Sequence, residues 1–176
     1  MLSAFLIALG VALDETGALA DDATTANAVK NAETPGERKE RLAVLGNPTL
    51  AGRRDLCRRF FLGCAAGELL DPDAAENVAV GRAMFDLHKP ANLCVPALAA
   101  ELAGNTFART LQRDLNVLGD VVENFAAAVY LPLTKGLRDG LSAEKFEEVY
   151  GDTSDDRFRA VLADVRTRVR EMKAYK

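Results

Sequence analysis

Residues 98–118 read LAAELAGNTFARTLQRDLNVL, and this stretch decides the fold. Its large apolar residues recur at the spacing of one helical face; they are Leu98, Leu102, Phe107, Leu111, Leu115 and Leu118. Polar residues between them, among them Glu101, Asn105 and Arg109, predict that the other face of this helix lies in water. The apolar stripe then needs partner helices, so a helical bundle is the first inference.

The composition agrees with a helical domain. The chain has 176 residues, of which 49% are hydrophobic and 27% charged, and it contains no Trp. A chain of this length can bury about 70% of its unfolded surface, so its core needs neither disulfides nor a metal ion. The abundance of alanine suits closely packed helices. The net charge of −4 disfavours a nucleic-acid partner, because duplex affinity depends largely on Lys and Arg at phosphates.

Start and stop signals place further helices on both sides of this stretch. Asp71 followed by Pro72 is a strong helix start, and the helix is expected to run to about His88. Ser142 is expected to cap a short helix. A continuous stripe from Phe158 to Met172 predicts a last helix, capped at Thr153 or Ser154. Residues 50–70 carry another apolar stripe and predict another helix. A further helix is predicted over 121–137 and is expected to kink or close at Pro132. Its apolar stripe consists of Val121, Val122, Phe125, Val129, Leu133 and Leu137.

Counting the long elements gives four helices after residue 50, joined by short loops. The predicted fold is therefore all-α, an antiparallel (up-down) four-helix bundle over residues 50–176. Residues 1–49 form an apolar segment and an extended arm. The segment 1–13 is too short to span a bilayer, which takes about 20 residues. Two interpretations stand equally: a translocation remnant cleaved after Ala18-Leu19-Ala20, or a helix that docks on a partner or on the domain itself.

The one dense basic cluster lies at the start of the 50–70 helix. It consists of Arg53, Arg54, Arg58 and Arg59, which are the candidate partner-binding residues of this chain. The cluster fits an amphipathic helix whose positive face meets an acidic partner. The run 58–62, RRFFL, also matches the core of a twin-arginine export signal, although Glu68 interrupts the apolar stretch that should follow.

No catalytic motif occurs in the sequence. There is no phosphate-binding glycine loop, no nucleophile elbow, no zinc-protease motif and no Cys-x-x-Cys pair. The single histidine, His88, has no metal-ligating residue three or four positions on, and it fits the end of a helix. The three cysteines Cys57, Cys64 and Cys94 are expected to be small buried hydrophobes. We therefore expect no enzyme activity, no catalytic or metal-binding residue and no cofactor.

Two short segments resemble the PsbQ-type extrinsic subunits of photosystem II. Residues 111–118, LQRDLNVL, are similar to the L-x-x-D-L segment of that family, and 142–146, SAEKF, with Tyr150 after it, resembles the start of its last helices. The resemblance covers about residues 71–173, and the insert-like 129–133, VYLPL, departs from it. It implies a four-helix bundle with an N-terminal arm and no catalytic site.

The resemblance also implies a role and a location. Such a chain would lie in the chloroplast thylakoid lumen, peripheral to the membrane, and stabilise the oxygen-evolving complex. Its partner would be the photosystem II core, bound through the arm and the basic helix face. The alternative is a cytoplasmic helical protein that binds a partner, or a small hydrophobic ligand or pigment near Cys57, Cys64, His88 and Cys94. This alternative predicts a cavity, and the first interpretation predicts an interior without one.

Overall fold

The computed structural model describes residues 2–13, 34–87 and 92–175, and within them the chain is all-α. The helices are α1 (Leu2–Leu13), α4 (Pro35–Leu45), α5 (Arg54–Leu69), α6 (Pro72–Asp86), α7 (Val95–Arg113), α8 (Leu115–Asn124), α9 (Ala127–Tyr130), α10 (Ala143–Tyr150), α11 (Asp156–Arg170) and the 3-10 helix η1 (Lys173–Tyr175). His88, the segment 18–20 and most of the predicted arm lie outside the described residues.

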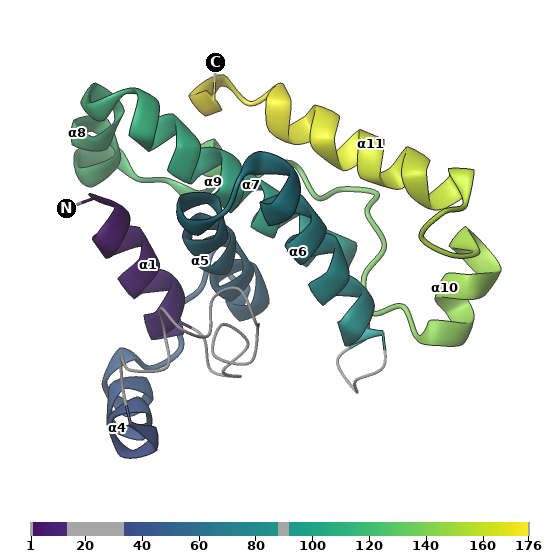
Figure 1. Cartoon of the computed structure of the whole chain (residues 1–176), viewed down its shortest axis with the longest axis horizontal. Coiled ribbons are helices and arrows are strands. Elements are labelled where there is room, and N and C mark those ends of the chain that lie inside the picture. Colours follow the sequence, from purple (N-terminus) through teal and green to yellow (C-terminus); the bar gives the residue numbers. More distant parts are fainter. Residues whose placement is uncertain (1, 14–33, 88–91, 176) are drawn as a thin grey trace.

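Helix α7 is the centre of the structure. It contacts α5, α6 and α11, which surround it in Figure 1, and it also touches α1, α8, α9 and η1. The predicted apolar stripe is buried at Leu98, Leu102, Phe107 and Leu111. The predicted wet face is wrong for the first half of the helix, because Glu101 is 0% exposed. Alanines and Gly104 fill the rest of that face, and these small residues let two further helices cover it.

The tightest contact in the fold joins α5 and α7 through two glycines. A Cβ atom built on Gly63 would lie 2.9 Å from the carbonyl carbon of Glu101, and one built on Gly104 would lie 2.9 Å from that of Phe60. Both distances are shorter than real side chains show. The two backbones therefore touch directly, which glycine alone permits.

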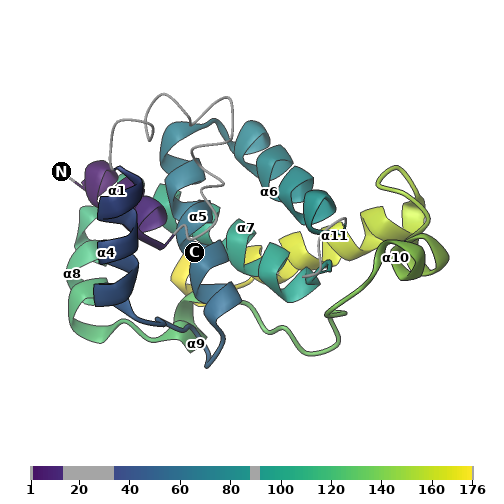
Figure 2. The same cartoon turned by 90° about the horizontal axis from the view of Figure 1, so that it is seen from below.

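Helices α5 and α7 run in the same direction. Helix α6, which lies between them in the sequence, runs the opposite way. Arg53 lies against Cys94 at the start of the pair, with Nη2 and Sγ 3.1 Å apart. At the other end, Arg109 donates to the carbonyl oxygen of Leu70 at 3.0 Å. Figure 2 shows α5, α6 and α7 grouped together, with α11 passing across the group and α10 at its far end.

Two predicted helix starts are confirmed, and the cap of the last helix is corrected. The side chain of Asp71 accepts from the backbone N–H groups of residues 73 and 74, which starts α6. Ser142 caps α10 by accepting from the N–H of Lys145. The cap of α11 is Asp155, which accepts from the N–H of Arg157, instead of Thr153 or Ser154.

Two predicted helices are shorter than their apolar patterns. The central helix ends at Arg113, because Asp114 adopts an extended conformation, and α8 begins a new direction at Leu115. The helix predicted over 121–137 is reduced to the end of α8 and the single turn of α9. Leu131 is extended, as expected for the residue before Pro132.

Helix α1 docks on the domain itself, as one of the two interpretations of the apolar segment expected. It packs on α5, with Leu6 2% exposed and Gly10 close enough to Ala65 that a Cβ would clash. The opposite side of α1 leaves Phe5 57% exposed. None of the described helices combines the length and hydropathy that a membrane crossing requires.

Candidate functional site

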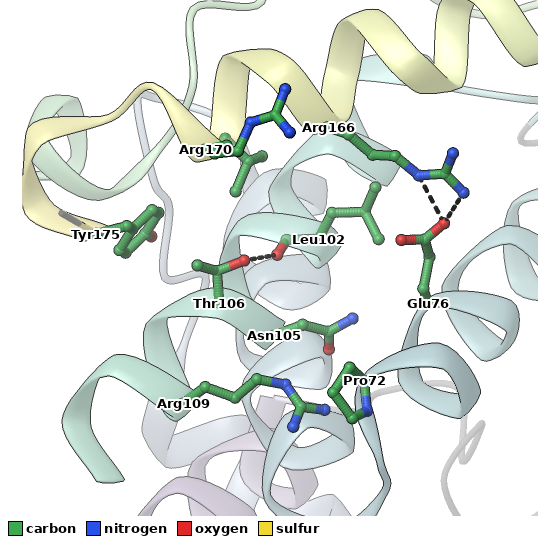
Figure 3. A pocket seen from close by; sticks show the side chains of 10 residues that line it. Pro72, Glu76, Leu102, Asn105, Thr106, Arg109, Arg166, Arg170 and Tyr175 are labelled. Atoms are coloured by element: carbon green, nitrogen blue, oxygen red, sulfur yellow. Dashed lines mark hydrogen bonds and ion pairs between the residues drawn. The ribbon is translucent and has the colours of Figure 1, made fainter. Parts of the chain in front are cut away.

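A cavity of about 310 Å³ lies where α6, α7, α11 and η1 meet, and we call it the α7 cavity (Figure 3). Its apolar walls come from Pro72, Leu102, Val169 and the ring of Tyr175. Its polar lining consists of Glu76, Asn105, Thr106, Arg109, Arg166 and Arg170. The volume falls at the lower end of the range for ligand sites in proteins, about 300–1,000 Å³.

The wall formed by η1 is held by a partly buried tyrosine. The hydroxyl of Tyr175 donates to the carbonyl oxygen of Tyr130 at 2.7 Å, which ties η1 to α9. Burial raises the pKa of Tyr175, so its hydroxyl stays protonated and keeps donating over the ordinary pH range. The cavity thus has a fixed boundary on this side.

Asn105 supplies the most unusual group of the cavity. Its side chain is 7% exposed, and its Oδ1 atom is buried without a hydrogen-bond partner among the described residues. A buried acceptor without a donor costs about 1–3 kcal/mol, so each one in a native structure needs an explanation. Figure 3 shows the Asn105 side chain between Arg109 and Glu76, with Oδ1 on the side of Arg109.

The charge of the cavity lining is positive. Three arginines and one glutamate line it, leaving two positive charges in excess. Arg166 is bound to Glu76, to which it donates from both Nε and Nη2. Arg109 is half-buried and donates to the Leu70 carbonyl, but no carboxylate among the described residues forms an ion pair with it.

A separate network of four charged side chains, two of them buried and two partly buried, lies where α5, α6 and α7 meet. Arg59 Nη1 lies 2.8 Å from Glu101 Oε2, and Arg59 also binds Asp86. The second oxygen of Glu101 accepts from Arg82. Burial acts to lower the pKa of Arg59, but the charges of Glu101 and Asp86 outweigh it and raise the pKa. The network is neutral overall and joins the three helices, which gives it a structural role.

The predicted basic docking face is not formed as one surface. Arg59 is 4% exposed and belongs to the network around Glu101, so its side chain is not part of an exposed basic face. Arg53 is bound to Asp55 and Asp139. Arg54 is exposed and Arg58 is half-buried. Successive arginines of one helix point in different directions, so this cluster does not offer a single positive face.

Cys94 caps the start of α7 and is surrounded by charges. Its Sγ accepts from the N–H of Ala97 at 3.3 Å and lies 3.6 Å from Asp55 Oδ2. Burial, and then the hydrogen bond to Asp139, raises the pKa of Cys94 to about 12. Burial acts to raise the pKa of Asp55 as well, but the hydrogen bond and charge of Arg53 outweigh it and lower that pKa. The Cys94 thiol is therefore protonated at neutral pH, and Arg53 holds the carboxylates beside it.

We predict that Cys94 reacts slowly with iodoacetamide despite its partial exposure. At pH 8 a pKa of about 12 leaves far less thiolate than the ordinary pKa of about 8.5, so alkylation should be at least about a hundredfold slower than in denaturant. The Asp139→Asn variant should react faster, because it removes a carboxylate that raises this pKa. Mass spectrometry of quenched samples measures the rate; equal rates in native and denatured protein would contradict the prediction.

The other candidate residues do not gather into one site. Cys57 and Cys64 are free and buried, as predicted, and neither they nor Cys94 line the α7 cavity. His88 lies outside the described residues. Among the residues described, no three His, Cys, Asp or Glu side chains are placed to hold a metal ion.

The sequence contained signals for the features that the prediction missed. Glu101 and Asn105 lie in a run of alanine and glycine, LAAELAGN, which marks close packing on that side of the helix. Gly63 and Gly67 are four residues apart on α5, and both face the α7 backbone. Nothing local indicated that Arg166 and Arg170 on the last helix would reach the same cavity.

No family model, curated protein or solved structure matches this chain.

Proposed function

We propose that the chain is a non-catalytic protein that binds a small polar ligand in the α7 cavity. The observation that carries this proposal is Asn105, which lines a cavity of ligand size and whose buried Oδ1 has no hydrogen-bond partner among the described residues. A ligand with a hydrogen-bond donor would satisfy that acceptor and recover its desolvation cost. Beside the apolar walls, the six polar and charged side chains of the lining offer hydrogen bonds that the hydrophobic ligand or pigment suggested by the sequence would not use.

We also propose that α5, α6, α7 and α11 act as the four-helix unit predicted from the sequence. The contacts of α7 with the other three support this grouping. In a regular up-and-down bundle the closest neighbours are antiparallel. Here the closest pair, α5 and α7, is parallel, and α11 is the helix that completes the cavity.

A binding role fits the chemistry of the accessible thiol. Cys94 is held protonated by burial and by its acidic surroundings, which makes it a poor nucleophile. The polar groups of the cavity offer hydrogen bonds and positive charge. These are groups that hold a ligand in place.

The test compares two matched variants against the small-molecule fraction of a cell extract by saturation-transfer NMR. Thr106→Phe fills the cavity, whereas Thr110→Phe places the same ring one helical turn on, outside the lining. Both threonines donate to the carbonyl four residues earlier at 3.0 Å, so both variants lose the same local bond. Wild type and Thr110→Phe should saturate the same ligand signals, and Thr106→Phe should not. Equal saturation by all three proteins would contradict the proposal.

A second candidate function is the extrinsic subunit of photosystem II that the sequence resemblance implies. Apolar side chains at the end of α8, in α9 and after it support a docking surface, because Phe125 is 40%, Val129 46% and Leu133 82% exposed. They lie within or beside the insert-like residues 129–133. Under this proposal the chain would dock on the lumenal side of the complex through this surface and the exposed Arg54.

Affinity purification from source membranes in mild detergent tests the second candidate. Photosystem II core subunits should be recovered in near-equal amounts with the wild-type chain. The Leu133→Asp variant should lose them, because a charge at this exposed position opposes apolar docking without entering the core. Recovery of the chain without these subunits would contradict this candidate and leave the cavity proposal standing.

A further inference from the structure

We infer that the ligand of the α7 cavity is a small oxyanion, a carboxylate or phosphate, that carries a hydroxyl or amino donor beside its anionic group. This inference rests on the proposed function and names the chemical class of its ligand. It follows from two side chains on one face of α7 that require different ligand groups. Arg109 is a cation and pairs with an anion, and Asn105 Oδ1 is an acceptor and pairs with a hydrogen-bond donor.

Arg109 provides the anion-binding group. It is half-buried, and among the described residues it donates a hydrogen bond to a neutral carbonyl, that of Leu70. One guanidinium nitrogen is thus used to orient the side chain, and the remaining N–H groups are available to an oxyanion. Figure 3 shows this guanidinium extended along the floor of the cavity toward Pro72. A planar guanidinium binds carboxylate and phosphate oxygens in pairs, which gives direction as well as attraction.

Asn105 provides the recognition of the donor. Its Oδ1 is buried and accepts no hydrogen bond from the described protein groups. An oxyanion without a donor would leave this acceptor unsatisfied and would bring negative charge close to it. A hydroxyl or amino group on the ligand removes that cost, so the site should discriminate against analogues that lack the donor.

The spacing of the two groups limits the ligand. Asn105 and Arg109 are four residues apart and lie on the same side of α7, and Figure 3 shows Oδ1 on the side of the guanidinium. The donor and the anion must therefore be close neighbours in the ligand, as in a 2-hydroxy acid, a 2-amino acid or a phosphate ester with an adjacent hydroxyl. A cavity of about 310 Å³ suits a ligand of this small size.

The remaining charges favour an anion over a cation. Glu76, the one carboxylate of the lining, is already bound to Arg166, so it is not available to a cationic ligand. Arg170 adds positive charge at the outer edge, where Figure 3 shows its guanidinium directed away from Asn105. Positive charge at a cavity entrance also attracts anions before they bind.

Three probes of nearly equal size test separately, on the wild-type chain, whether the ligand needs an anionic group and whether it needs a hydrogen-bond donor. Lactate carries both the anion and the hydroxyl, propanoate lacks the hydroxyl, and propane-1,2-diol lacks the anion. Dissociation constants are measured from the amide shifts of α7 in NMR titrations of the full chain. Lactate should bind at least about tenfold more tightly than either analogue, since each missing interaction is worth about a factor of ten. Glycerol 3-phosphate is titrated in parallel, and the tighter of the two anions identifies carboxylate or phosphate.

Variants then assign each requirement to its residue. Arg109→Met should reduce lactate affinity to that of the diol, whereas Arg113→Met, one turn further on and exposed, should leave it within about twofold. Asn105→Leu should reduce lactate affinity to that of propanoate without changing propanoate binding. Thermal melts show whether each variant is folded, and the wild-type comparison does not depend on them.

The outcomes separate this inference from the proposed function. If the diol shifts the α7 amides as strongly as lactate, the cavity is a binding site and the anionic ligand class is wrong. If propanoate binds as tightly as lactate, the role assigned to Asn105 is wrong. If neither lactate nor glycerol phosphate binds, the inference is overturned, and the extract experiment with Thr106→Phe decides the proposed function by itself.

Discussion

Replacing Gly104 by alanine is expected to lower the free energy of unfolding by at least about 3 kcal/mol. The added Cβ would lie 2.9 Å from the Phe60 carbonyl carbon and 3.0 Å from the Cys64 nitrogen, and closer still to the Phe60 oxygen. These are backbone atoms of α5, so no side-chain rotation relieves the overlap, and the two helices must separate. Because small domains have a total stability of about 5–15 kcal/mol, a large share of the folded population should be lost. Urea unfolding followed by circular dichroism measures the change.

Gly81→Ala is the matched control for this substitution. Gly81 lies in the middle of α6, and a Cβ there would meet no atom within 4 Å. Alanine should therefore stabilise the protein by about 0.5–1 kcal/mol, because it removes the conformational entropy of a mid-helix glycine. Opposite signs for the two variants would establish that the α5–α7 backbone contact is the cause. A Gly104→Ala variant as stable as wild type would contradict the packing described here.

Replacing Glu101 by leucine is expected to cost about 3–5 kcal/mol. Glu101 is 0% exposed and its carboxylate binds Arg59 and Arg82, so the substitution leaves the buried guanidinium of Arg59 and the partly buried one of Arg82 with Asp86 as the remaining carboxylate of the network. Breaking a buried ion pair from one side has this cost because the remaining charge cannot be solvated. Arg82 already has one buried nitrogen, Nη2, without a partner among the described residues, so these residues offer the network no spare acceptor. Thermal and urea unfolding measure the effect.

A double-mutant cycle and a surface pair test this explanation. Adding Arg59→Met to Glu101→Leu removes one charge of each sign and leaves Arg82 with Asp86, so the double variant should be less destabilised than the sum of the single variants. The exposed pair of Arg159 and Asp156, at 63% and 97% side-chain exposure, should contribute less than about 1 kcal/mol when broken. Additive effects within the buried network would contradict the ion-pair account.

The two halves of α7 connect stability with the proposed binding. Glu101 holds α5 and α6 on one side of the helix, and Asn105 and Arg109 face the cavity one and two turns further on. The network therefore fixes the position of the helix that carries the binding groups. Conservative variants within the cavity can change the ligand preference without disturbing this anchor.

The sequence by itself determined the helical class and several helix boundaries. Asp71 with Pro72 and Ser142 were recognised as starts because capping depends on groups within four residues of one another. Pro132 ended the regular structure at Leu131 for an equally local reason. The apolar stripe of α7 identified the central helix, because a period of 3.6 residues can be recognised in the amino-acid sequence alone.

Tertiary structure alone decided the surroundings of each face. Glu101 and Asn105 read as solvent-facing because their neighbours are alanine and glycine, which carry little hydrophobic signal but allow the closest helix contacts. Arg59 read as one of four docking arginines, yet it meets carboxylates 27 and 42 residues away. The α7 cavity joins residues from Pro72 to Tyr175. Such contacts depend on how separate helices cross, which no local pattern encodes, so the buried charges and the α7 cavity form only when the chain is folded.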